Sequence, residues 1–225
     1  MSARLRGGIT IALCPFQMMI ALPIRVGLCA AWLVAVVAGL GVLISYQNAA
    51  GVAGETPRQW PATAQLSPDP SRPTLLMFVH PQCPCSRASM EELNRLLAQN
   101  GGRVKTHVLF LRPSGLAANW THTGLRQTAA AIPGVTVHDD VDGVQAKNFG
   151  AETSGQVLLY DARGNLLFTG GITEGRGHAG DNAGVTTIVS LLQGQNVSSS
   201  QTPVYGCALQ DTCEMTSQRR LAWKQ

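Results

Sequence analysis

The feature that most constrains this chain is an uncharged run near its start. Residues 26–46 are 21 consecutive residues without an acidic or basic side chain. At a rise of about 1.5 Å per residue, such a run spans roughly 30 Å as a helix, which matches the hydrocarbon core of a bilayer. The apolar core of a secretory signal is usually shorter, about 7–15 residues. The run therefore predicts one uncleaved transmembrane anchor.

The basic residues around this anchor predict its orientation. Arg4, Arg6 and Arg25 precede the uncharged run, whereas the next basic residue after it is Arg58. Because cytoplasmic flanks carry the excess of Lys and Arg, residues 1–25 are expected in the cytoplasm and the C-terminal part outside. The sequence thus predicts a single-pass membrane protein with its C-terminal domain outside the cytoplasm.

Two details near the anchor leave alternatives open. Residues 9–24 are apolar but carry Pro15 and Pro23, so they could be an N-terminal extension, an interfacial segment or a second weak span. The small residues Gly51–Ala53 would suit a signal peptidase, so cleavage after them is the alternative to a permanent anchor.

The chain beyond the anchor has the size of one domain. With 13% charged residues, 45% hydrophobic residues and a net charge of +4, it is neither a disordered chain nor a protein that coats nucleic acid. Residues 47–73 contain five prolines and little periodic hydrophobicity, which predicts a linker. The domain is then expected over residues 74–193, followed by a polar, cysteine-containing tail over residues 194–225.

The start of the domain reads as a strand, a cysteine loop and a helix. Residues 74–79 are a short apolar run bounded by prolines, as in a buried strand. From Ser86 onward, apolar residues recur at helical spacing until Gly101 and Gly102. Residues 104–111 read as a second strand, and the intervening helix implies that the two strands are parallel.

The rest of the domain predicts further alternation of strands and helices. The expected helices are 123–131, 143–149 and one carrying Val185, Ile188, Val189 and Leu192, and the expected strands are 135–137, 157–160 and 166–169. The last two strands flank a turn-rich connection of hairpin length. The fold class is therefore α/β, with a mixed, mostly parallel sheet covered by helices on both faces.

This order of elements, together with the sequence HPQCPCSRASMEEL at residues 80–93, resembles a thioredoxin-like domain over residues 74–192. The Cys-Pro-Cys loop, residues 153–155 and the glycine-rich loop 170–182 are similar to a narrower group, the membrane-anchored bacterial thioredoxin-like proteins sometimes called RedB. The resemblance implies thiol-disulfide exchange at the cysteine loop, with a redox protein or a thiol as partner. It also implies that the anchor lies in a bacterial inner membrane and the domain in the periplasm.

The motif departs from an ordinary thioredoxin in having Cys83-Pro84-Cys85 in place of Cys-x-x-Cys. A disulfide across it closes a smaller and more strained ring, which makes it easier to reduce. Pro84 restricts the loop to turn conformations. The start of the following helix and Arg87 would both favour a thiolate. We expect Cys83 to be the more accessible, attacking thiol and Cys85 the resolving thiol; the register that makes Gln82 occupy the nucleophile position remains the alternative.

A second departure lies just before the hairpin, where thioredoxins carry a cis-proline beside the cysteines. This chain reads Thr153-Ser154-Gly155 there, which puts a broad protein-disulfide exchange activity in doubt. Gly155 would still allow the backbone to approach another group closely.

The thioredoxin resemblance implies that the loop over residues 170–182 lies near the active-site end of the domain. It is interpreted either as a flexible loop ending in a helix cap at Asp181 or Asn182, or as the source of a base or metal ligand, His178. His80 is a second histidine near the cysteines in sequence. His107 and His138 are expected to be structural.

Two further cysteines lie in the tail. The first interpretation is a structural disulfide between Cys207 and Cys213. The alternative is that Cys207 folds back to the cysteine loop, where it relays electrons or completes a metal site; loop-closure entropy rises only slowly with length and does not forbid this.

The sequence therefore predicts a membrane-anchored, extracytoplasmic thiol-disulfide oxidoreductase without a cofactor. The rival function is a copper-binding or copper-delivering module, with Cys83, Cys85 and His178 or His80 as soft and borderline ligands for cuprous ion. A non-catalytic thioredoxin-like adaptor is the third alternative. No nucleic-acid partner is expected.

Overall fold

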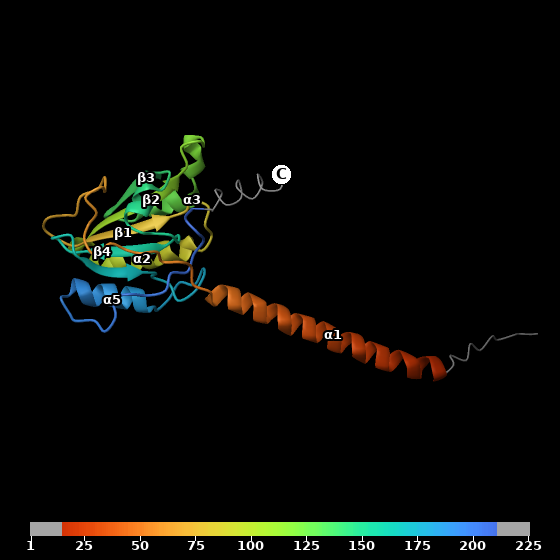
Figure 1. Ribbon diagram of the computed structural model, residues 1–225. Coiled ribbons are helices and arrows are strands. Elements are labelled where there is room, and N and C mark those ends of the chain that lie inside the picture. The colour runs from red at the N-terminus through yellow and green to blue at the C-terminus, as the bar shows by residue number, and fades with distance from the viewer. Residues whose placement is uncertain (1–14, 211–225) are drawn as a thin grey trace, which may run out of the picture. The chain divides into compact units, whose positions relative to one another are not determined.

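The computed structural model describes residues 15–210, in two units that are described separately (Figure 1). The first unit ends at Tyr46, and its described part lies in the helix α1, Pro15–Asn48, whose last two residues belong to the second unit. Its part from Pro23 to Asn48 is long and apolar enough to cross a membrane. Because α1 continues through Pro23, residues 15–24 belong to the same helix as the predicted anchor and are not a separate segment.

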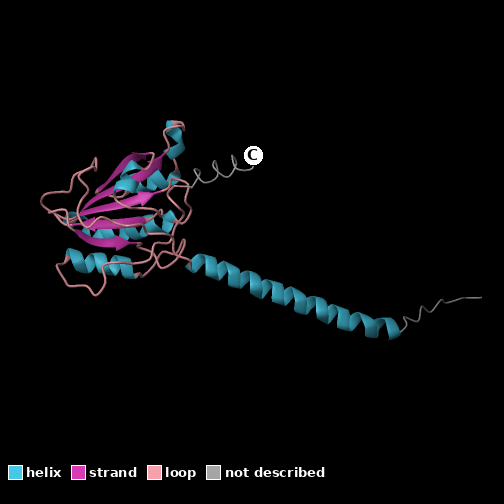
Figure 2. Cartoon of the chain, in the orientation of Figure 1, coloured by secondary structure: helices cyan, strands magenta, loops and turns pink. Residues whose placement is uncertain are grey.

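The second unit is built on one mixed sheet of five strands (Figure 2). The strands are β1 Thr74–Val79, β2 Lys105–Arg112, β3 Val135–Val141, β4 Gln156–Tyr160 and β5 Leu166–Gly170. Their order in the sheet is β3-β2-β1-β4-β5. Strands β1, β2 and β3 are parallel, while β4 is antiparallel to β1 and β5 to β4. The predicted sheet, with its terminal antiparallel hairpin, is confirmed.

The helices also follow the predicted order. They are α2 Ser86–Asn100, α3 Gly124–Ala131, α4 Val144–Asn148 and α5 Ala183–Leu192, with short 3₁₀ turns at Gly101–Arg103 and Ala118–Thr121. Strand β3 is longer than predicted, because its polar second half, residues 138–141, still pairs with β2. An edge strand has backbone pairing on one side only and tolerates polar side chains there.

Strand β1 is buried on both faces, which explains its unbroken apolar sequence. Alternate side chains point to opposite sides of a strand. Leu75, Met77 and Val79 lie in a core with side chains of α2, α3 and α5, while Leu76 and Phe78 lie in a second core with side chains next to α4. Since β1 is the central strand, its carboxyl end fixes where the cysteine loop begins.

The segment before β1 packs on the second face of the sheet, beside α4. Trp60 packs edge-on against Phe149 and Tyr160, with ring centroids 5.0 and 5.1 Å apart, and donates a 2.9 Å hydrogen bond to the carbonyl of Leu66. The prediction that residues 47–73 are a free linker is therefore wrong. Helix α4 has only five residues, so apolar side chains of this segment complete the cover.

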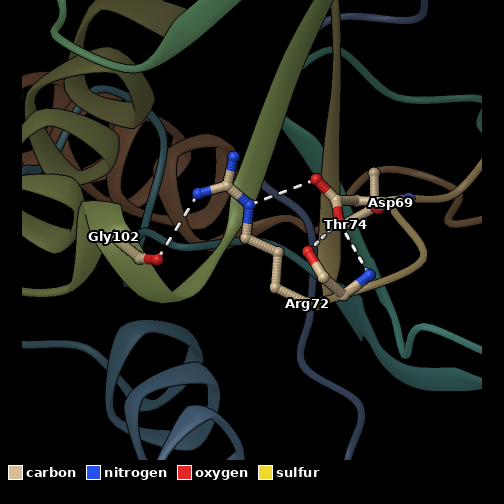
Figure 3. A network of polar contacts seen from close by, with 5 residues as sticks. Asp69, Arg72, Thr74 and Gly102 are labelled. Carbon is tan, nitrogen blue, oxygen red and sulfur yellow. Dashed lines mark hydrogen bonds and ion pairs between the residues drawn. The ribbon is translucent and has the colours of Figure 1, made fainter.

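A polar network fixes the end of this segment just before β1 (Figure 3). The guanidinium of Arg72 lies 3.2 Å from the carboxylate of Asp69 and donates a 3.4 Å hydrogen bond to the carbonyl of Gly102, after α2. The backbone amide of Asp69 donates to the hydroxyl of Thr74 at 2.8 Å. The entry to β1 is thus tied to the end of the helix that follows it.

The described part of the tail also packs against the domain. Val204 pairs with Gly51, and Ala208 pairs in antiparallel fashion with Thr153. The side chain of Leu209 is 1% exposed and belongs to the second core. The polar tail predicted over residues 194–225 is thus corrected for residues 201–210, since their backbone pairs with the sheet unit and Leu209 contributes to its core.

Candidate active site

The cysteine loop is a tight turn between β1 and α2. The amide of Cys83 donates to the carbonyl of His80 at 3.0 Å, and the carbonyl of Cys83 accepts from the amide of Ser86 at 3.3 Å. The carbonyl of Cys85, the residue before α2, already accepts from the amide of Ala88 at 3.2 Å. Pro84 lies exposed between them, where it has no amide to satisfy.

Three sulfur atoms meet at this loop. The Sγ atoms of Cys83, Cys85 and Cys207 all lie within 4.8 Å of one another. The closest contact, 2.9 Å, joins Cys83 to Cys207 across 124 residues of sequence. All three are free thiols, as is Cys29 in α1. The structure therefore places Cys207 beside the dithiol loop.

A short stretch of strand-like pairing carries Cys207 to this position. The carbonyl of Cys207 accepts a 2.8 Å hydrogen bond from the amide of Ser154, and the amide of Leu209 donates a 2.8 Å hydrogen bond to the carbonyl of Glu152. A Cβ atom at Gly206 would lie 1.9 Å from the carbonyl oxygen of Ser154, so only glycine allows this approach. The guanidinium of Arg176 donates a hydrogen bond to the Gly206 carbonyl.

Ser154 occupies the region where thioredoxins carry proline, and the structure uses both of its polar groups. A proline there would have no amide to hold the carbonyl of Cys207. The Ser154 hydroxyl accepts from the amide of His80 at 2.8 Å and lies 2.8 Å from the hydroxyl of Ser86. Both serines are buried, with exposed fractions of 0% and 1%. These roles of Ser154 were not predicted from the sequence.

The position of Ser86 in the sequence could have indicated that it belongs to the site. Ser86 follows Cys83 by three residues, the same spacing that separates the cysteines of Cys-x-x-Cys. With Cys83 in the first position, a buried serine stands where a second cysteine would lie. Cys83 therefore has its neighbouring thiols at Cys85 and at Cys207.

The thiols of the cluster have different acidities. Burial raises the pKa of Cys83, but hydrogen bonds from Cys207 and Ser86 outweigh it, and the pKa falls below its ordinary value. Burial, and the nearby Cys83 sulfur, raise the pKa of Cys85. Burial and the hydrogen bond with Cys83 raise the pKa of Cys207 to about 12. Of these three thiols, Cys83 alone has a pKa below its ordinary value.

The positive charge at the cluster belongs to Arg176, on the loop after β5. Its guanidinium lowers the pKa values of Cys85 and Cys207, opposing the larger effect of burial. Arg87, which the sequence analysis assigned this role, has an exposed side chain on the first turn of α2. The glycine-rich loop thus supplies an arginine where we expected a histidine.

The expectation that Cys83 is the more accessible thiol is wrong. Its side chain is 3% exposed, whereas Cys85 and Cys207 are partly exposed. The sulfur of Cys207, in the tail segment, lies 2.9 Å from that of Cys83. Accessibility and acidity are therefore divided between different cysteines of the cluster.

His178 lies outside the group of sulfur atoms. Its side chain is exposed, and its Nδ1 atom lies 3.1 Å from the carbonyl of Arg176. The loop ends in the predicted cap: the side chain of Asn182 accepts a 2.8 Å hydrogen bond from the amide of Val185. His80 stacks edge-on against Trp120, with ring centroids 5.4 Å apart.

Gly155 brings the loop before β4 close to α2. Its φ of +91° favours glycine, and a Cβ atom there would lie 2.9 Å from the hydroxyl of Ser89. Its amide donates a 2.8 Å hydrogen bond to the carbonyl of Phe78. Gly155 therefore positions Ser154 against the cysteine loop.

The predicted disulfide between Cys207 and Cys213 stays a prediction. Cys213 lies outside the described residues, while Cys207 is described next to Cys83.

Strand order, the cysteine loop after the central strand and the terminal hairpin together define a thioredoxin-like fold. No protein-family model and no curated protein matches this sequence. A hypothetical protein from Sinorhizobium meliloti is similar in structure, with a TM-score of 0.56 and 18% identity over 70% of this chain and 96% of the other. An uncharacterized conserved protein from Geobacillus kaustophilus has a TM-score of 0.53 and 16% identity, covering 71% and 92% of the two chains. A putative thiol:disulfide interchange protein DsbE from Chlorobium tepidum has a TM-score of 0.42 and 18% identity, covering 64% and 98%.

Proposed function

We propose that this protein is a thiol-disulfide oxidoreductase in which Cys83 is the nucleophile. One observation carries the proposal: the Cys83 thiol lies at the turn between the central strand and α2, with two further thiols within 4.8 Å. Thiolate is the reactive form of cysteine, and a second thiol nearby is what completes disulfide exchange.

The exchange takes place in two displacements. The Cys83 thiolate attacks one sulfur of a substrate disulfide, which forms a mixed disulfide and releases the first substrate thiolate. A neighbouring thiol then loses its proton and attacks the Cys83 sulfur, which releases the second substrate thiolate. Two protein thiols are oxidised to one disulfide, and one substrate disulfide is reduced to two thiols. The sequence analysis names Cys85 as this neighbouring thiol.

The proposed location is outside the cytoplasm, at a bacterial inner membrane. The support is the apolar helix α1, which can span a bilayer by its length and composition, and the excess of arginine before its uncharged part, residues 26–46. A compartment that permits disulfides suits three clustered cysteines. The partner is then a redox protein or a thiol of that compartment.

The test uses the full-length protein in detergent micelles and a fluorescent peptide disulfide as substrate. Cys83→Ser is expected to lower the exchange rate by at least about a hundredfold, because no other thiol of the cluster loses its proton as easily. Cys29→Ser, which changes a cysteine of α1, is the matched control and should keep the full rate. Full activity of Cys83→Ser would refute the proposal.

A second candidate function is cuprous-ion binding, and the three clustered sulfur atoms favour it. Thiolates are the ligands that cuprous ion prefers. The three ligands would be Cys83, Cys85 and Cys207, and His178 would not take part. We place copper binding second because the guanidinium of Arg176 already supplies positive charge to Cys85 and Cys207, where a cation would bind. Titration of the reduced protein with cuprous ion against a chelator tests it, with Cys207→Ser as the variant that should lose binding.

A further inference from the structure

The thiol that lies closest to Cys83 is not the one that its sequence motif suggests. The sulfur of Cys207 is 2.9 Å from that of Cys83. A disulfide bond is about 2.05 Å long, so the two side chains need only a small approach to form one. The backbone of Cys85, in contrast, is already committed to the start of α2 by the Ala88 amide. A disulfide between Cys83 and Cys85 would have to form across that constrained turn.

The position of Cys207 is built by the fold. Backbone hydrogen bonds with Glu152 and Ser154, the close approach at Gly206 and the contact with Arg176 all fix the segment that carries it. Buried side chains anchor the segment on both sides, Val204 before the thiol and Leu209 after it, each 1% exposed.

We propose that Cys207 is the resolving thiol of this protein, and that residues 204–209, the tail strap, are locked over the site when Cys83 and Cys207 form a disulfide. This inference rests on the proposed function, because it needs Cys83 to react with a substrate disulfide. Cys207 of the tail, and not Cys85, then carries out the second displacement. In the oxidised protein the C-terminal segment covers the site.

The electrons and protons balance in this reaction. The Cys83 thiolate and the Cys207 thiol react with one substrate disulfide to give the Cys83–Cys207 disulfide, one substrate thiol and one substrate thiolate. The proton of Cys207 passes to the released thiolate. Cys83 is 3% exposed and its sulfur contacts that of Cys207 in the strap, so the strap moves aside while the substrate disulfide reacts and returns to displace the bound half.

Disulfide mapping tests the assignment on the full-length protein. The protein is oxidised in detergent with oxidised glutathione, alkylated and digested with trypsin without reduction. Cys83 and Cys85 lie in peptide 59–87, because the bond between Arg72 and Pro73 resists cleavage, and Cys207 and Cys213 lie in peptide 177–219. The expected product is a cross-link between these two peptides.

Single substitutions identify which sulfur atoms form the cross-link. It should persist in Cys85→Ser and in Cys213→Ser and disappear in Cys207→Ser. In Cys207→Ser, Cys83 should accumulate as a mixed disulfide with glutathione, seen in the intact mass. Wild-type protein whose disulfide lies within peptide 59–87, or within peptide 177–219, would overturn the inference. If exchange activity persists in that case, the proposed function stands; if Cys83 forms no disulfide of any kind, both fail.

A steric variant separates the strap from the thiol itself. Gly206→Ala keeps all cysteines but adds a Cβ atom that would lie 1.9 Å from the carbonyl oxygen of Ser154. It should slow cross-link formation by roughly tenfold or more, because the reacting sulfurs are no longer aligned. Gly115→Ala is the control, since a Cβ atom there meets nothing within 4 Å. An unchanged rate in Gly206→Ala would contradict the role of the strap.

Discussion

The guanidinium of Arg176 donates a hydrogen bond to the backbone carbonyl of Gly206, so the loop after β5 holds the residue that precedes the third thiol of the cluster. The same guanidinium acts electrostatically on Cys85 and Cys207. One side chain therefore influences both the position of the tail and the charge of the site.

Substitution of Arg176 tests its electrostatic role. Arg176→Ala should raise the pKa of Cys85 further, because the positive charge that opposes burial is lost. Alkylation of Cys85 by iodoacetamide, followed residue by residue with tandem mass spectrometry, should then shift to higher pH. Arg163→Ala, in the exposed turn between β4 and β5, should leave the profile unchanged. An identical profile for both variants would show that Arg176 does not act on the thiol.

Ser154 should contribute to stability through its buried hydroxyl. Ser154→Ala removes the acceptor for the His80 amide and the partner of the Ser86 hydroxyl. Leaving buried polar groups unpaired costs about 1–3 kcal/mol, so the free energy of unfolding in urea should fall by this amount. Ser198→Ala, at an exposed position, should change it by less than about 0.5 kcal/mol. A neutral Ser154→Ala would mean that water or a new rotamer replaces these bonds.

The His107–His138 pair predicts a pH dependence of stability away from the cysteines. Their ring nitrogens are 2.8 Å apart, and burial, with the neighbouring His138, lowers the pKa of His107 to about 4. Burial also lowers the pKa of His138. Since the unfolded pKa is about 6.5, the unfolded chain binds more protons between these values, and stability falls as the pH drops from about 7 toward 4. The loss should be on the order of 2 kcal/mol.

Urea unfolding at several pH values measures this slope. His107→Leu should flatten it between pH values of about 4 and 7, while His178→Leu, at an exposed position, should leave it as in the wild type. Equal slopes in all three proteins would assign the pH dependence to other groups.

Trp60 should stabilise the domain although it lies before the first strand. Trp60→Ala removes two edge-on ring contacts and the hydrogen bond to Leu66. Because the ring is only partly buried, a loss of about 2–3 kcal/mol is expected by urea unfolding. Trp60→Phe keeps an aromatic ring and should lose about half as much. If Trp60→Ala unfolds at the same urea concentration as the wild type, the segment does not cover the sheet in solution.

The sequence predicted the parts of the fold that local pattern determines. Strand β1, the turn at Cys83 and helix α2 were predicted because apolar periodicity and proline mark their limits. The role of residues 47–73 was not predicted, since proline content describes chain stiffness and not whether side chains such as Trp60 find a partner. The hydrogen bonds that place Cys207 also join residues far apart in the sequence, so local pattern did not predict them.

The candidate site shows the same division. Cys83 and Cys85 came from a local motif, whereas their actual environment depends on Arg176 and Ser154, which lie far away in sequence. His178 was the more reactive residue type in the loop, but the path of the backbone brings Arg176 to the sulfurs instead. Composition of a loop does not determine which of its side chains faces inward.

The bridge between Gly51 and Val204 has a practical consequence for any shortened version of this protein. The residues that directly follow the apolar helix and those that directly precede Cys207 are neighbours in one strip of backbone pairing, with the amide of Gly51 bonded to the carbonyl of Val204 at 2.8 Å. A version that starts at Thr56 would lose that support. Measurements on its Cys207 would then describe a loosened C-terminal segment and not the cysteine cluster of the full-length protein.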